Sequence, residues 1–191
     1  MAPRATTRTK PVNRPGRTRV TADELAAAVG RHAAEELADA LAKIKHCVGQ
    51  LDEAAIWSRP GAGLNSICNL LLHLEGNLTQ WIASGLGGAA DRRNRPAEFA
   101  ERGPIPADAL LRRLDAAVAQ ASAALAGLSA DELTSICRIQ GFDVTGLAAI
   151  FHSVPHFRGH TQEIVHLTRT LLGDRYRIHW QPATPEQGAA N

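Results

Sequence analysis

Four long stretches of the sequence repeat apolar residues every three or four positions, and this pattern constrains the fold more than any other feature. That spacing places the apolar side chains on one face of an α-helix. We expect helices over roughly residues 22–51, 65–84, 106–128 and 145–172. Four amphipathic helices bury their apolar faces together most simply in a bundle, so the sequence predicts an all-α, antiparallel four-helix bundle.

Capping residues mark where these helices begin. Thr21 and Glu24 have the spacing of a capping box, in which two side chains satisfy free backbone N–H groups of the first turn. Asn65 is the expected N-cap of the second helix, and Pro106 suits the first turn of the third. Aromatic residues make up only 4% of the chain. That composition argues against a β-sandwich or barrel, because strands favour aromatic and β-branched residues.

The charge distribution separates a basic N-terminal arm from the rest of the chain. Residues 1–20 contain six Arg and Lys residues and no acidic residue, although the whole chain has a net charge of only +2. We predict a disordered arm over 1–20, one bundle domain over 21–180 and a loose tail over 181–191. The arm could contact nucleic acid or anionic lipid, but it lacks aromatic residues for base stacking, so a solvated extension is the simpler interpretation.

The sequence does not predict secretion or a membrane span. We find no stretch of about 18 apolar residues, and no basic start followed by an apolar run and a cleavage site. Cys47, Cys68 and Cys137 are odd in number and form no CxxC pair. They favour a reducing compartment and a role as small core residues, so we expect a cytoplasmic protein.

Histidines follow one face of the last predicted helix. His152, His156 and His160 are four residues apart, so each step advances about 40° beyond a full turn and the imidazoles align. Two imidazoles at this spacing can bind one metal ion. His73 lies at the edge of the apolar stripe of the second helix. If the second and fourth helices are neighbours, His73 completes a three-nitrogen site.

Three imidazoles suit Zn, Ni or Fe and leave coordination positions open for water or substrate, whereas a structural site is normally closed by four ligands. Glu163 lies on the same face. Its carboxylate could be a fourth ligand, a partner that orients an imidazole, or a group at the rim of the bundle. His152 could be a ligand, a proton shuttle or a polar neighbour, and we favour a neighbour. Asn77 lies one turn beyond His73. The competing interpretation is a set of unrelated histidines satisfied by backbone or water.

Two separate segments resemble one known family. The run from Asn65 to Asn77, followed by Gln80-Trp81-Ile82, resembles the second helix of the DinB/YfiT-like family of four-helix-bundle metalloproteins. The later segment resembles the HxxxHTGQI pattern of that family, through His156, His160, Thr161 and Ile164. The likeness extends from about residue 35 to residue 175.

The resemblance implies a divalent metal, often nickel or zinc, held here by His73, His156 and His160. It also implies activities known in some members, which are S-transferases using a low-molecular-weight thiol such as bacillithiol, or a mycothiol-dependent isomerase. Several members form dimers. This chain departs from the pattern, since Gln162 and Glu163 follow Thr161. Pro155 is expected to kink the helix just before His156, which affects the ligand geometry.

The sequence therefore predicts a metal-dependent thiol S-transferase or hydrolase that attacks a small electrophilic substrate. The alternative is a non-catalytic helical scaffold or interaction protein, with or without a structural metal. A small-molecule substrate and a homodimer are the expected partners, and we expect neither nucleic acid nor a membrane to be one. The four arginines of the segment 89–104 either attract an anionic substrate or, as we favour, form a solvated loop: Arg92, Arg93, Arg95 and Arg102.

Overall fold

The computed structural model describes residues 19–180, and within them the chain is mostly helical. The predicted C-terminal tail, and all but two residues of the predicted basic arm, lie outside the described residues. The helices and strands are, in order, α1 (Ala22–Val48), α2 (Glu53–Trp57), α3 (Ile67–Leu78), the π-helix η1 (Thr79–Ser84), α4 (Arg95–Ala100), α5 (Ala107–Ala126), α6 (Ala130–Thr134), β1 (Ile136–Ile139), β2 (Phe142–Thr145), α7 (Gly146–Leu172) and the 3-10 helix η2 (Gly173–Arg175).

Local capping chemistry explains where the long helices start. Thr21 and Glu24 form the predicted capping box of α1. The N-cap of α3 is Ser66 instead of the predicted Asn65, because the Ser66 hydroxyl accepts from the backbone N–H of Asn69. Pro106 precedes α5, and the Thr145 hydroxyl caps α7. All four predicted helices therefore exist, with ends within a few residues of those expected.

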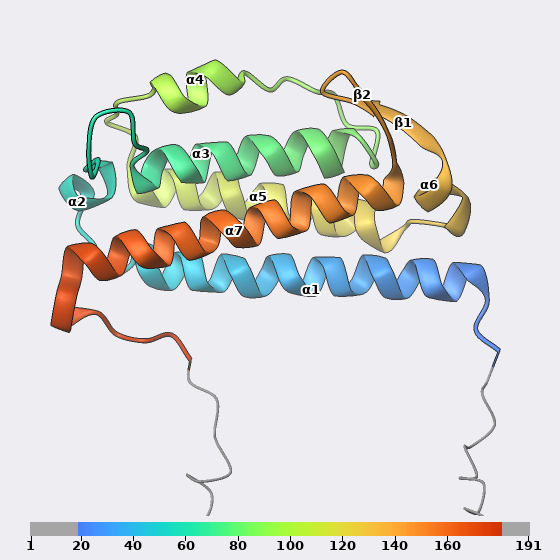
Figure 1. The fold of residues 1–191 in the computed structure, drawn as a ribbon, viewed down its shortest axis with the longest axis horizontal. Helices are drawn as coiled ribbons and strands as arrows, with labels where there is room; N and C mark the ends of the chain where they lie inside the picture. The colour runs from blue at the N-terminus through green and yellow to red at the C-terminus, as the bar shows by residue number, and fades with distance from the viewer. Residues whose placement is uncertain (1–18, 181–191) are drawn as a thin grey trace, which may run out of the picture.

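The long helices contact one another in a regular way. α1 contacts α5 and α7, and α3 contacts the same two helices. In Figure 1, α1 and α7 run in one direction, while α3 and α5 run in the opposite one. The all-α class is thus confirmed. The helices do not simply alternate in direction, because the segment 85–106, which we call the crossover, returns along α3 before α5 begins (Figure 1).

The apolar faces of these helices meet in one core. Its largest fully buried side chains come from all four long helices and include Leu37, Ile44, Leu70, Leu114 and Phe157. Each such side chain stabilises the fold by about 1.5–3 kcal/mol relative to an exposed position. Gly30 of α1 is also buried, since a Cβ there would lie 2.1 Å from the carbonyl oxygen of Leu125. This glycine allows α1 and α5 to approach closely.

Several short elements were not predicted from the sequence, among them α4 and a β-hairpin. The crossover contains α4, which lies against α3. Strands β1 and β2 form an antiparallel hairpin in which Ile139 pairs with Phe142. Its two-residue turn places Gln140 at φ 52° and Gly141 at φ 86°, the left-handed backbone that tight hairpin turns require.

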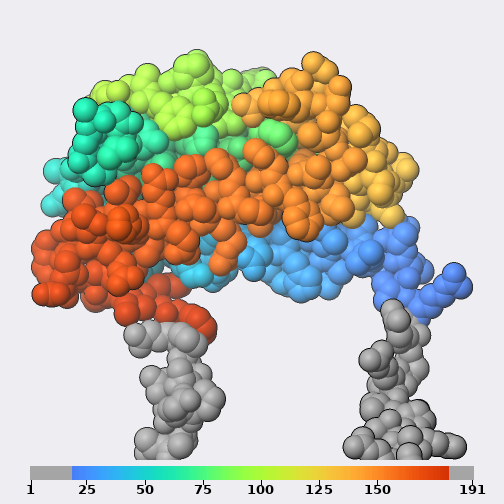
Figure 2. Space-filling model, in the orientation of Figure 1, coloured from blue at the N-terminus to red at the C-terminus, as the bar shows by residue number. Residues whose placement is uncertain are grey.

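Helix α7 forms part of one face of the molecule (Figure 2). Figure 2 shows α7 across the middle of one face, with α1 on one side and the crossover and hairpin on the other. Helix α7 continues through Pro155 from Gly146 to Leu172. Among the helices of residues 19–180, none is both long and apolar enough to cross a bilayer.

Candidate metal centre

The three predicted metal ligands lie together between α3 and α7. His73 comes from α3, and His156 and His160 come from successive turns of α7. One ring nitrogen of each lies within 4.8 Å of the other two. The Nε2 atoms of His73 and His156 are 2.9 Å apart. The structure therefore brings together the residues that the sequence singled out, and this group could hold a metal ion.

The donor set and its spacing fit a divalent ion. Bonds of about 2.05 Å at tetrahedral angles place ligand nitrogens about 3.3 Å apart. The 2.9 Å separation between His73 and His156 is slightly below this value, and the group as a whole extends to 4.8 Å. Imidazole nitrogen is a suitable ligand for Zn, Ni and Fe.

The cluster is buried on one side and accessible on the other. His73 is only 5% exposed, while His156 and His160 are partly exposed. Burial, followed by the neighbouring charges of His160, His73, His152 and Arg93, lowers the pKa of His156 to about 4. His156 is thus neutral at pH 7 and has a lone pair to offer.

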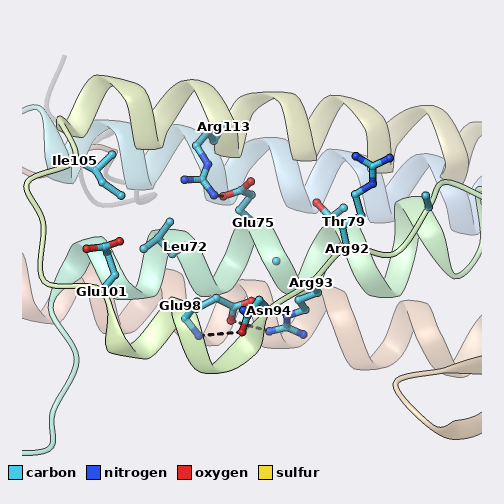
Figure 3. Close-up of a pocket in the computed structure, with 13 residues that line it drawn as sticks. Leu72, Glu75, Thr79, Arg92, Arg93, Asn94, Glu98, Glu101, Ile105 and Arg113 are labelled. Carbon is cyan, nitrogen blue, oxygen red and sulfur yellow. Dashed lines mark hydrogen bonds and ion pairs between the residues drawn. The ribbon is translucent and has the colours of Figure 1, made fainter.

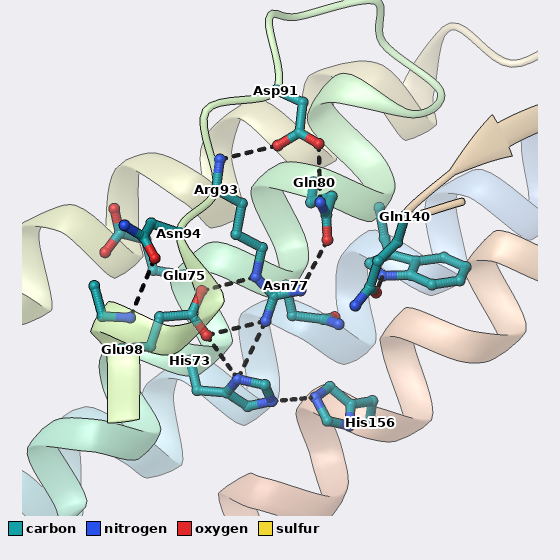
Figure 4. Close-up of polar contacts among 12 residues, drawn as sticks. His73, Glu75, Asn77, Gln80, Asp91, Arg93, Asn94, Glu98, Gln140 and His156 are labelled. Atoms are coloured by element: carbon teal, nitrogen blue, oxygen red, sulfur yellow. Dashed lines mark hydrogen bonds and ion pairs between the residues drawn. The ribbon is translucent and has the colours of Figure 1, made fainter. Parts of the chain in front are cut away.

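A buried carboxylate that the sequence analysis missed holds His73. Oε2 of Glu98, from α4, lies 2.9 Å from Nδ1 of His73. Arg93 donates from Nε to Oε1 of Glu98 at 2.7 Å, and Figure 4 shows these side chains converging above α3. Burial would raise the pKa of Glu98, but hydrogen bonds from His73 and Arg93 outweigh it and keep the pKa below its usual value.

Glu163 contacts another imidazole of the cluster. Its Oε2 lies 2.7 Å from Nδ1 of His160. In this position the carboxylate orients the ring and leaves Nε2 of His160 for another partner, as carboxylates beside metal-binding histidines commonly do. Of the roles considered for Glu163, this contact favours orientation of the ring.

His152 and Asn77 lie beside the three histidines. His152 stacks on Trp81 with ring centroids 3.8 Å apart, and its own ring lies 5.9 Å from that of His156. Burial, aided by the charge of Arg93, lowers the pKa of His152. Asn77 accepts a hydrogen bond from Ser153, which joins α3 to α7 one turn from the cluster. Both residues support or border the site and do not belong to the group of three.

The arginine-rich segment is structured and does not form a solvated loop throughout. A cavity of about 420 Å³ lies between α3, the crossover and α5, and Figure 3 shows Arg92, Arg93 and Glu98 among its lining residues. The Arg93 side chain is only 3% exposed. Arg95 lies over the Phe99 ring, and Arg102 donates to backbone carbonyls. Of the four arginines, Arg93 thus has a buried side chain, and it pairs with Glu98.

Comparisons with known proteins define the family. A family model described as a protein of unknown function, DUF1572, matches residues 26–182. The chain belongs to this family. The matched range includes His73, Glu98, His156 and His160, but the description names neither an activity nor the DinB/YfiT-like family.

A solved structure shows the same kind of fold. It is the crystal structure of a conserved protein from Enterococcus faecalis, which is 17% identical to this DUF1572 protein. The two superpose with a TM-score of 0.58 over 78% of this chain and 96% of the other. At this identity the likeness concerns the fold alone. No curated protein matches the sequence.

Proposed function

We propose that this protein is a metal-dependent enzyme in which His73, His156 and His160 hold one divalent ion, Zn, Ni or Fe. The observation that supports this function most directly is the convergence of three imidazole nitrogens within 4.8 Å of one another. They come from helices that are far apart in the sequence. An ion held by three protein ligands can lower the pKa of a coordinated water or thiol and so supply a nucleophile at neutral pH.

The protein's own residues prepare the site for such chemistry. Glu98 and Glu163 each contact an Nδ1 atom, of His73 and His160 respectively, and so direct the two Nε2 atoms toward the centre. His156 and His160 are partly exposed, which supports access of a small molecule to the centre. We infer a small electrophilic substrate, attacked by water or by a low-molecular-weight thiol, which is hydrolase or S-transferase chemistry.

We also propose that the fold is a four-helix bundle and that the protein is related to the DinB/YfiT-like family. The contacts of α1 and α3 with α5 and α7 support a four-helix bundle of the DinB/YfiT type. The three histidines proposed as ligands are the ones that the resemblance to that family implies. A homodimer and a cytoplasmic location remain predictions from the sequence.

The main competitor is a scaffold with a closed structural metal site. Such a site would need a fourth ligand, and Glu163 is the nearest candidate in sequence. Its carboxylate contacts Nδ1 of His160 and its side chain is 43% exposed, which favours the open, three-ligand interpretation.

Elemental analysis of the purified full-length protein tests the proposal. We expect about one equivalent of Zn, Ni or Fe in the wild type and almost none in His156→Ala. His166→Ala is the matched control, because His166 is an exposed histidine of the same helix. Metal-loaded protein is then assayed with thiols and electrophiles. A wild type that takes up no metal, even after incubation with each ion, would leave the scaffold as the better interpretation.

A further inference from the structure

The crossover places a buried ion pair, Arg93 and Glu98, beside His73 of the candidate metal centre. The side chains of Arg93 and Glu98 are 3% and 8% exposed, and both belong to the crossover, not to the helices that carry the three histidines. We propose that Glu98 and Arg93 are positioning residues that fix the tautomer and orientation of His73 and thereby set the affinity for the divalent ion. This inference rests on the proposed function.

The contact with Glu98 determines which nitrogen of His73 carries the proton. An ionised carboxylate only accepts hydrogen bonds, so Nδ1 of His73 donates to Oε2 of Glu98 over 2.9 Å. Nη2 of Arg93 lies 3.2 Å from the same Nδ1, but it also donates to Oε2 of Glu98 over 3.0 Å, and a protonated Nδ1 does not accept from it. The lone pair is then on Nε2, which is the atom that faces His156 at 2.9 Å. Glu98 therefore presents the unprotonated nitrogen of His73 to the site.

Arg93 prevents the carboxylate from rotating away. Its guanidinium contacts both oxygens of Glu98, at 2.7 and 3.0 Å. Another nitrogen of Arg93 donates to Gln80 at 3.0 Å, and Gln80 donates to Asp91 at 2.8 Å. Asp91 in turn accepts from the backbone N–H of Arg93, so the network closes on itself, as Figure 4 shows.

A glycine on α3 makes room for this arrangement. Gly76 lies three residues beyond His73 and therefore on the same helical face. A Cβ at position 76 would lie 2.1 Å from Oε1 of Glu98 and 3.0 Å from Nε of Arg93. An added Cβ at position 76 would therefore displace the carboxylate from its present place beside His73. This close fit is independent of the hydrogen bonds themselves.

The energetics also point to a role beyond stability. Desolvation of a buried ion pair costs about as much as the attraction returns, and apolar replacements of the same volume are often neutral or stabilising. Stability therefore gives little reason to bury Glu98 and Arg93. Control of an adjacent imidazole gives a reason, because partners of metal-bound histidines typically change metal affinity 10–100-fold.

The test is a titration of the metal-free full-length protein with Zn²⁺, and with Co²⁺ for its absorption spectrum. Glu98→Gln keeps the shape of the side chain but removes its charge, and Gly76→Ala displaces the carboxylate without changing it. Gly127→Ala is the matched control, because Gly127 has φ −94° and an added Cβ would come no closer than 3.9 Å to its neighbour. Circular dichroism verifies that each variant is folded.

We expect Zn²⁺ dissociation constants 10–100-fold higher in Glu98→Gln and Gly76→Ala than in the wild type and Gly127→Ala. The Co²⁺ spectrum should change in the same two variants. If Glu98→Gln unfolds because Arg93 is left unpaired, the double variant Glu98→Gln/Arg93→Met, which removes both charges, must show the same loss of affinity.

The other outcomes distinguish the positioning role of Glu98 and Arg93 from metal binding by the three histidines. Wild-type affinity and an unchanged Co²⁺ spectrum in folded Glu98→Gln, Gly76→Ala or the double variant would overturn the positioning role. If His73→Ala still lost the metal in that case, the proposed function would stand. A wild type that binds neither Zn²⁺ nor Co²⁺ would overturn both.

Discussion

His73 and His156 are 83 positions apart in the sequence, yet their Nε2 atoms lie 2.9 Å apart across the contact between α3 and α7. At this distance one nitrogen donates a hydrogen and the other accepts it. The two rings therefore meet through these nitrogens. His160 follows one turn later on α7, and its ring centroid lies 4.5 Å from that of His156.

Metal binding should stabilise the folded protein through these residues. At a free Zn²⁺ concentration one hundred times the Kd, the gain is about 2.7 kcal/mol, which corresponds to a rise in Tm of about 5–10 °C for a chain of this size. Thermal melts with Zn²⁺ and with EDTA measure this rise. We expect it in the wild type and in His166→Ala, and not in His73→Ala. An equal rise in all three proteins would place the ion elsewhere.

The metal-free protein should lose stability in acid through His156. Its pKa is lowered to about 4, mainly by burial, from an ordinary value of 6.5. Between these values the unfolded chain binds a proton that the folded protein does not bind, so the free energy of unfolding falls as the pH falls from 6.5 to 4. The loss from this residue is at most about 3 kcal/mol.

Urea unfolding with EDTA present, at several pH values between 7 and 4, measures this effect. His156→Asn cannot titrate there, so its stability should depend less steeply on pH than that of the wild type. Parallel curves for the two proteins would show that His156 is not the residue responsible.

Much of this arrangement is predictable from the sequence, because it depends on local patterns. Helices α1 and α7 follow from apolar periodicity, and the capping box of Thr21 and Glu24 marks the start of α1. Histidines at helical spacing are unusual beside an apolar core, so the sequence indicates a metal site at His156 and His160. His73 came from its place at the edge of the apolar stripe of the second helix, and the resemblance to the DinB/YfiT-like family implied the same three ligands.

The remaining features depend on how distant segments meet. Glu98 follows His73 by 25 positions, and its role depends on the path of the crossover, which no local pattern specifies. In sequence, Arg93 and Glu98 look like part of a charged loop. The hairpin was missed because its large apolar residues are exposed, with Ile136 at 68% and Phe142 at 61%. The pair Gln140-Gly141 between two short β-prone runs was the available signal.

Replacement of Gly30 tests the contact between α1 and α5. The Cβ of Gly30→Ala would lie 2.1 Å from the carbonyl oxygen of Leu125, so the two helix backbones must separate. We expect a loss of about 1–3 kcal/mol in the free energy of unfolding, measured with urea, as for other overpacked interiors. Gly159→Ala is the control, because position 159 is an exposed position of α7 with nothing within 4 Å. It should gain about 0.5–1 kcal/mol, and a similar gain in Gly30→Ala would contradict the contact.

The three cysteines should differ in reactivity according to their burial. Cys47 and Cys68 are buried, whereas Cys137 on β1 is partly exposed. Burial, with the charge of Glu53, raises the pKa of Cys68 to about 12, so only about one Cys68 thiol in ten thousand is ionised at pH 8. Since the thiolate is the reactive form, Ellman's reagent should modify Cys137 first and the other two only on unfolding.

Cys137→Ser should remove the fast phase of the native protein. A fast phase that persists in this variant would mean that Cys47 or Cys68 is reached through an opening of the core.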